Sequence, residues 1–168
     1  TNGKTDNRVF EENDAALAGL GEAVYGAGKD YTSVAYLTVS TGVGGVKIDH
    51  QKIDQITADS EPGFQIIKDS QTLEDLISGY GLQKQFGKKA EDLKDPAVWD
   101  EVAKNLAIGI KNIASWWSPE VVVLGGGVMK SIDIEKVKKY AQEVNIRLAK
   151  LGDSSALWGA LACINNSR

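Results

Sequence analysis

The spacing of apolar residues along this chain predicts a series of amphipathic helices. The first begins near Asp14, because alanine, leucine and valine then recur at helical spacing as far as Val24. Thr72 and Asp75 form a capping-box pattern, which predicts a helix that continues over residues 73–87. Short polar side chains therefore mark the starts of both helices.

Three further helices are expected in the second half of the chain. Asp95, with Pro96 at the first helical position, predicts the start of the longest helix, which has one apolar face. Residues 132–150 continue an amphipathic pattern that predicts one helix. Asp153 opens the last helix, in a stretch rich in leucine and alanine.

Runs of β-branched and aromatic residues predict the strands. Residues 34–40 form a buried strand, and a glycine loop then leads to a hairpin. This hairpin has a strand at residues 46–48, a turn near His50 and a return strand toward Ile56. Residues 121–124 are continuously apolar, which is typical of a central parallel strand. Helices and strands in this mixture predict an α/β domain.

The composition narrows the functional classes. The chain has 168 residues, which is enough for one domain with a core. A net charge of −4 and a pI near 5.1 argue against nucleic acid or a membrane surface as a partner, and Lys88 and Lys89 are expected to be a solvated pair. The single cysteine, Cys163, excludes an internal disulfide and fits a reducing, cytoplasmic setting. We expect neither a membrane span nor a signal peptide.

The carboxylates in front of the first helix have two possible explanations. Asn13 or Asp14 can accept hydrogen bonds from the first free N–H groups of the helix, and the helix dipole favours an acidic residue there. The alternative is a role in catalysis. On the local pattern alone, a helix cap is the simpler explanation.

Two predicted strands run directly into glycine-rich turns, at residues 41–45 and 125–127. Glycine lets backbone N–H groups approach a phosphate, because no Cβ atom intervenes. Neither turn is a Walker loop or a dinucleotide fingerprint, since neither GxxxxGK[ST] nor GxGxxG occurs there. Tight packing is the simpler explanation of either turn taken singly.

Taken in order, however, six segments resemble successive motifs of the ROK family of sugar kinases. The resemblance covers the chain from about Glu11 onward, and it implies the actin-like, ribonuclease H-like ATPase fold, a mixed sheet flanked by helices. The segments are ENDAALAGLGEAVYGAG, YLTVSTGVGG, SEPGFQII, LEDLISG, SPEVVVLGGGV and GDSSALWGALA.

The resemblance also implies that a domain precedes these residues. Family members carry an N-terminal domain with a first phosphate loop of the DxGGT type, and no such motif occurs here. The chain starts at Thr1, and its sole methionine is Met129. We therefore expect residues 1–168 to be the C-terminal domain of a two-domain sugar kinase.

The resemblance assigns roles to individual residues. Asp14 is the expected catalytic base, because a carboxylate within reach of a primary alcohol can take its proton as the γ-phosphoryl group transfers. Asn13, Glu61 and Glu74 are the expected contacts to sugar hydroxyls, although Glu61 could also be a solvated turn residue and Glu74 an anion at a helix start. The expected nucleotide contacts are Thr41, Gly42 and Gly44 at the phosphates, and Gly125, Gly126 and Gly127 at the adenosine.

The chain departs from the family pattern after Glu61. Many relatives have a histidine where Phe64 stands, followed by a CxCGxxGC segment that binds structural zinc. No cysteine follows here before the next helix, and His50 is expected to be an exposed turn residue. We therefore expect no zinc, and a shorter loop closed by apolar contacts of Phe64, Ile66 and Ile67. ATP, with Mg²⁺ bound to its phosphates, is the expected cofactor.

The expected function is ATP-dependent phosphorylation of a hexose-type hydroxyl by the full-length protein, with the isolated domain inactive. The expected partners are ATP and a small sugar. We expect no nucleic acid to bind this domain, and a homo-oligomer is possible. The alternative is the sugar-sensing domain of a ROK-type transcriptional repressor, which has a helix-turn-helix domain in front. The residues upstream of Thr1 would discriminate between the two.

Overall fold

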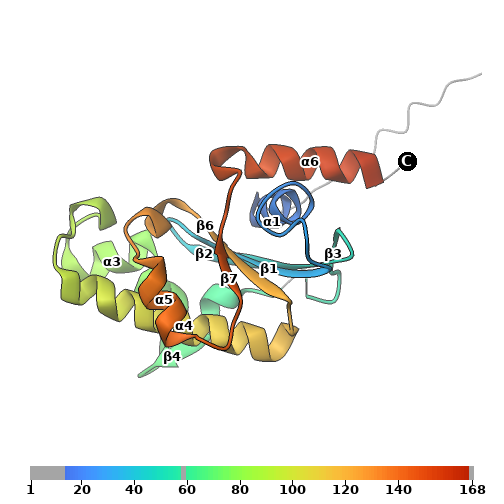
Figure 1. Cartoon of the computed structure of the whole chain (residues 1–168). Helices are drawn as coiled ribbons and strands as arrows, with labels where there is room; N and C mark the ends of the chain where they lie inside the picture. Colours follow the sequence, from blue (N-terminus) through green and yellow to red (C-terminus); the bar gives the residue numbers. More distant parts are fainter. Residues whose placement is uncertain (1–13, 58–59, 167–168) are drawn as a thin grey trace, which may run out of the picture.

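The computed structural model describes residues 14–57 and 60–166, which form a five-stranded sheet, a small two-stranded sheet and the helices packed around them (Figure 1). β1 pairs antiparallel with β2 and parallel with β6, so the larger sheet is mixed, as predicted. Its strands, in the order β3-β2-β1-β6-β7, are Lys52–Ile53, Val43–Asp49, Ser33–Val39, Val121–Gly125 and Ile146–Leu148.

Helices cover both faces of the larger sheet. α1 (Asp14–Val24) and α6 (Ser155–Asn166) lie on one face, and α4 (Pro96–Trp117) and α5 (Ile134–Tyr140) lie on the other (Figure 1). The side chains of β1 and β6 alternate between two buried clusters, so Tyr36 faces α1 while its neighbour Leu37 faces α4. The central strands are therefore buried on both sides, which explains their continuous apolar pattern.

The segment between β3 and α4 builds a separate corner of the molecule. The two short strands β4 and β5 form a hairpin, and two short helices follow it. The elements are η1 (Pro62–Phe64), β4 (Ile66–Lys68), β5 (Gln71–Thr72), α2 (Leu73–Ile77), α3 (Gly79–Phe86) and η2 (Ala90–Asp92).

The predicted caps of α2 and α4 are confirmed. Thr72 accepts the backbone N–H of Asp75 at 3.0 Å, and the Asp75 carboxylate accepts the N–H of Thr72 at 3.0 Å. These hydrogen bonds hold the pKa of Asp75 below its usual value. Asp95 accepts the N–H of Ala97 at 2.9 Å at the start of α4. Local side chains thus set both boundaries.

The prediction of one helix over residues 73–87 is wrong. Ser78 is extended (ψ 159°) and ends α2, and its hydroxyl then accepts the N–H of Gly81 to start α3. The N–H groups of Gly79 and Tyr80 leave the helical pattern and donate to the carbonyls of Ser40 and Thr41, at 2.7 and 3.0 Å. The helix breaks because its N–H groups hold the turn between β1 and β2.

The prediction of one helix over residues 132–150 is also wrong. α5 ends at Tyr140, and β7 then pairs in parallel with β6. The N–H of Val122 donates to the carbonyl of Asn145 at 2.8 Å, and that of Ala149 to Leu124 at 2.8 Å. The edge of β6 offers unpaired backbone groups, and satisfying them outweighs the local helical pattern.

Three smaller boundaries differ from the prediction. The return strand of the hairpin ends at Ile53 rather than near Ile56, and β2 begins at Val43, so the glycine loop is shorter than expected. Asp153 lies in the short η4 (Gly152–Ser154), one turn ahead of α6.

Among the residues that the structure describes, no helix is long and apolar enough to cross a membrane.

Candidate active site

The turn between β1 and β2 lies at the centre of the candidate site. The N–H of Ser40 donates to the carbonyl of Gly42 at 2.8 Å, which closes the turn. The two hydrogen bonds from the start of α3 fix its outer side. Because parallel β1 and β6 both end here, this is the sheet edge at which open α/β folds bind ligands.

Glu74 holds this turn directly. Its Oε2 atom accepts the N–H of Val43 at 2.8 Å, and a Cβ atom added to Gly42 would lie 2.7 Å from the same oxygen. The side chain is half-buried. Glu74 therefore has a structural role at the turn between β1 and β2.

Glu61 lies beside the start of β2. It is exposed and precedes η1, and its side chain makes no capping hydrogen bond there. The next residue, Pro62, packs so closely on β2 that a Cβ atom on Gly45 would lie 2.8 Å from its ring. The packing of η1 thus places the exposed Glu61 near this strand.

Asp14 is the first described residue of α1 and is exposed. Its neighbour Ala15 contacts β2, since a Cβ atom on Gly44 would lie 3.2 Å from the Cβ of Ala15. The start of α1 is therefore beside the turn between β1 and β2. Gly44 lies within β2 rather than in a loop, so close packing of α1 already accounts for this glycine. Asn13 lies outside the described residues.

The three glycines after β6 have different surroundings. Gly125 packs on the hydroxyl of Tyr36, whose pKa is raised by burial and lowered less by a hydrogen bond to Thr38. Gly126 has φ 97° and lies against the backbone of Val39, so it must be glycine. A Cβ atom on Gly127 would meet nothing within 4 Å. Gly127 therefore leaves open space where a ligand can approach.

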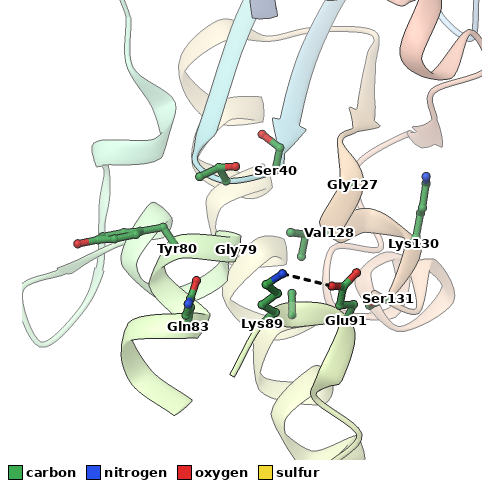
Figure 2. A pocket seen from close by; sticks show the side chains of 12 residues that line it. Ser40, Gly79, Tyr80, Gln83, Lys89, Glu91, Gly127, Val128, Lys130 and Ser131 are labelled. Atoms are coloured by element: carbon green, nitrogen blue, oxygen red, sulfur yellow. Dashed lines mark ion pairs between the residues drawn. The ribbon is translucent and has the colours of Figure 1, made fainter. Parts of the chain in front are cut away.

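A cavity of about 560 Å³ opens beside these glycines (Figure 2). Figure 2 shows side chains around it from the turn after β1, from α3, and from the segments around η2 and η3 (Gly127–Lys130). Its volume is typical of a small-molecule site. The lining residues are Ser40, Thr41, Gly79, Tyr80, Gln83, Lys89, Ala90, Glu91, Gly127, Val128, Lys130 and Ser131.

A second cavity, of about 430 Å³, adjoins the other side of the β6 glycines. All three of these glycines line it, together with Tyr36 and Asp153. The structure therefore brings five of the predicted nucleotide residues to one of the two cavities or to the turn between β1 and β2: Thr41, Gly42, Gly125, Gly126 and Gly127.

The sequence analysis missed several lining residues. Lys89 is exposed, as expected, and it also lines the larger cavity, where its ammonium group lies 4.0 Å from the carboxylate of Glu91. Tyr80, Gln83 and Lys130 carry no motif that would mark them. Tyr80 and Gln83 reach the cavity because α3 breaks away from α2, a feature that the local sequence did not reveal.

The short segment after Glu61 differs from the expected closure. Phe64 and Ile66 are 61% and 62% exposed, so the prediction that they close the loop by apolar contacts is wrong for both. Ile67 does pack on the core. Backbone pairing of β4 with β5 shapes this loop instead. In the described ranges, no group of three or more histidine, cysteine or acidic residues could hold a metal ion.

We expect the thermal midpoint of this protein to be unchanged by a strong zinc chelator. Structural zinc contributes directly to folding free energy and needs about four ligands. The two residues best suited as ligands are far apart in the chain, with His50 exposed at a hairpin turn and Cys163 on α6. Differential scanning calorimetry with and without chelator measures this, and stoichiometric zinc by elemental analysis would contradict it.

Comparison with known proteins identifies the family. The ROK family model matches residues 2–167. The chain belongs to the ROK family. An uncharacterized protein of Clostridium perfringens is 32% identical over 90% of this chain and 61% of its own length. A fructokinase of Pediococcus pentosaceus is 26% identical over 91% of this chain and 62% of its own length. This ROK chain thus spans about three fifths of these relatives.

Solved structures of the ROK family share the fold. A ROK hexokinase from Thermus thermophilus superposes with a TM-score of 0.81 at 27% identity, over 93% of this chain and 65% of the hexokinase. A ROK transcriptional regulator, a homologue of the Escherichia coli Mlc protein, has a TM-score of 0.73 at 19% identity, over 93% of this chain and 51% of its own. The actin-like ATPase fold expected from the sequence is therefore confirmed, and it occurs in kinases and regulators alike.

Proposed function

We propose that the full-length protein transfers the γ-phosphoryl group of ATP to a hydroxyl of a hexose-type sugar. The observation that supports this most is the position of Asp14. The packing of Ala15 on Gly44 brings an exposed carboxylate beside the turn that borders a cavity of nucleotide size. An acid–base group next to a phosphate-binding turn is the minimum that phosphoryl transfer to an alcohol requires.

In this proposal Asp14 accepts the proton of the sugar hydroxyl. The sugar oxygen then forms its bond to the γ-phosphorus as the bond to the β-phosphate oxygen breaks, and ADP leaves. Mg²⁺ would be held by the phosphates and neutralise their charge. The residues of this chain act by positioning and by electrostatics, because such transfer needs little covalent chemistry from the protein.

The sugar would lie near the start of β2, which the start of α1 with Asp14 approaches from one face of the sheet and η1 with Glu61 approaches from the other. Glu61 is placed by the packing of η1 on β2, and it would accept a sugar hydroxyl, with Asn13 as a further contact. Glu74 already accepts one backbone N–H through Oε2, so its Oε1 atom would be the one that meets the sugar. An ATP-dependent sugar kinase of this kind would act in the cytoplasm.

The nucleotide would lie along the glycines of β6. Gly127 leaves room for it, and Thr41 and Gly42 would bring backbone and hydroxyl donors to its phosphates. A screen of the full-length protein against a panel of hexoses with ATP, read as ADP release and sugar phosphate formed, tests the proposal. Failure to phosphorylate any sugar while ATP is bound would favour a sensor.

The second candidate is a sugar-sensing domain of a transcriptional regulator. The fold is shared with a ROK regulator, so the fold alone does not distinguish a kinase from a sugar sensor. The exposed Asp14 at the turn favours the kinase, because a sensor needs no base. Residues upstream of Thr1 decide between them: a DxGGT loop alone indicates a kinase, whereas a preceding helix-turn-helix domain indicates a regulator.

We expect the isolated 168-residue chain to show essentially no sugar-dependent ATP turnover. The proposal assigns these residues to the C-terminal domain, so the first phosphate loop would come from the missing domain. Without it, the phosphates lack part of their binding site and the cleft stays open to water. A coupled ADP assay compares the chain with the full-length protein, and robust turnover by the chain would contradict the two-domain assignment.

A further inference from the structure

The two cavities meet at three residues. Ser40, Gly127 and Lys130 each line both the cavity of 560 Å³ and the cavity of 430 Å³. Ser40 directly follows β1, while Gly127 and Lys130 belong to η3, which follows β6. A ligand that extends from one cavity to the other therefore passes the side chain of Lys130.

Lys130 brings an uncompensated positive charge to this junction. Lys89, the other lysine in the larger cavity, lies 4.0 Å from Glu91. Lys130, in contrast, takes part in none of the ion pairs formed between described residues. Figure 2 shows its side chain standing apart from the Lys89–Glu91 pair. An unpaired ammonium group in a concave site attracts an anion.

The backbone holds Lys130 in place from both sides. Gly126 turns the chain out of β6 with φ 97°, and the N–H of Met129 donates to its carbonyl at 3.2 Å. The N–H of Ser131 donates to Val128 at 3.0 Å. The side chains of Val128 and Met129 are buried, so η3 is anchored in the core directly before Lys130.

We propose that Lys130 binds the phosphate chain of the nucleotide where it crosses between the two cavities. A lysine ammonium offers three donors and a point charge, which suits phosphate oxygens. Gly127 leaves space beside it, and the hydroxyl of Ser40 lies on the same junction. The proposal rests on the proposed function, because it takes ATP as the ligand.

The test compares nucleotide binding by full-length variants. Lys130→Met removes the charge and keeps an unbranched side chain, Lys130→Arg restores the charge, and Lys139→Met is the control on the exposed side of α5, outside both cavities. Calorimetric titration with Mg·ATP and with adenosine gives the affinities. We expect Lys130→Met to weaken ATP binding by roughly 10- to 100-fold and to leave adenosine binding unchanged.

Lys130→Arg should retain most of the ATP affinity, and Lys139→Met all of it. Added salt should lower the ATP affinity of the wild type more than that of Lys130→Met, because the contact between Lys130 and the phosphates is ionic. Unchanged ATP affinity in Lys130→Met, or an equal loss for ATP and adenosine, would overturn the inference while the proposed function stands. A wild-type protein that binds no ATP would overturn both.

Discussion

Asp14→Asn in the full-length protein is expected to lower kcat for sugar phosphorylation by roughly 10²- to 10⁴-fold, the contribution usual for a general base. Asparagine caps a helix as well as aspartate does, so α1 should still form and the thermal midpoint should stay unchanged. Asparagine cannot take a proton from the sugar hydroxyl. Steady-state kinetics with a saturating sugar, alongside a thermal melt, measures both effects.

Asp30→Asn is the matched control for this experiment. Asp30 is also exposed, but it lies in the turn between α1 and β1 and lines neither cavity. Its substitution should leave kcat unchanged. If Asp14→Asn retains full kcat with an intact fold, then Asp14 is a helix cap and the base must be sought elsewhere.

Glu22→Ala is expected to destabilise this chain by about 2–5 kcal/mol, the range for breaking a buried charged hydrogen-bond network. Glu22 is fully buried in α1. Its carboxylate accepts the N–H of Ala27 at 2.8 Å and that of Leu151 at 2.7 Å. The hydroxyl of Ser155 lies 3.4 Å from the same oxygen that binds Leu151. Removing the Glu22 carboxylate leaves the N–H groups of Ala27 and Leu151 without their acceptor.

Urea unfolding followed by circular dichroism measures this change. Glu22→Gln should cost less than Glu22→Ala, because the amide keeps one acceptor oxygen for a backbone N–H. Glu143→Ala, at an exposed position after α5, is the control and should change stability by under about 0.5 kcal/mol. A loss for Glu22→Ala as small as that of the control would show that the network does not hold α1 to the start of α6.

Glu22 also illustrates how the sequence can hide a residue's role. A glutamate in the middle of an alanine-rich helix gives no local sign of burial, and its partners include Leu151 and Ser155, far away in sequence. Lys89 and Lys130 are similar cases, since the cavity that they line is formed by residues from segments far apart in the sequence. Such groupings depend on contacts between distant segments.

The sequence by itself determined the features that have local causes. The caps at Thr72 and Asp95 are set by hydrogen bonds within a few residues, so their patterns predicted the starts of α2 and α4. The apolar runs of β1 and β6 reflect burial on both faces, and they predicted a buried strand for β1 and a central parallel strand for β6. The order of motifs predicted the ROK family and its fold, which the comparisons confirmed.

Tertiary structure decided the rest. Residues 146–148 form a strand because the edge of β6 needs backbone partners, whereas the local pattern favours a helix. The helix expected over residues 73–87 breaks at Ser78 because the N–H groups that follow bind the turn after β1. Glu74 fixes that turn from 31 positions away. Backbone hydrogen bonds between distant segments carry no signature in local sequence, and here they outweigh helical propensity, which amounts to only a few tenths of a kcal/mol per residue.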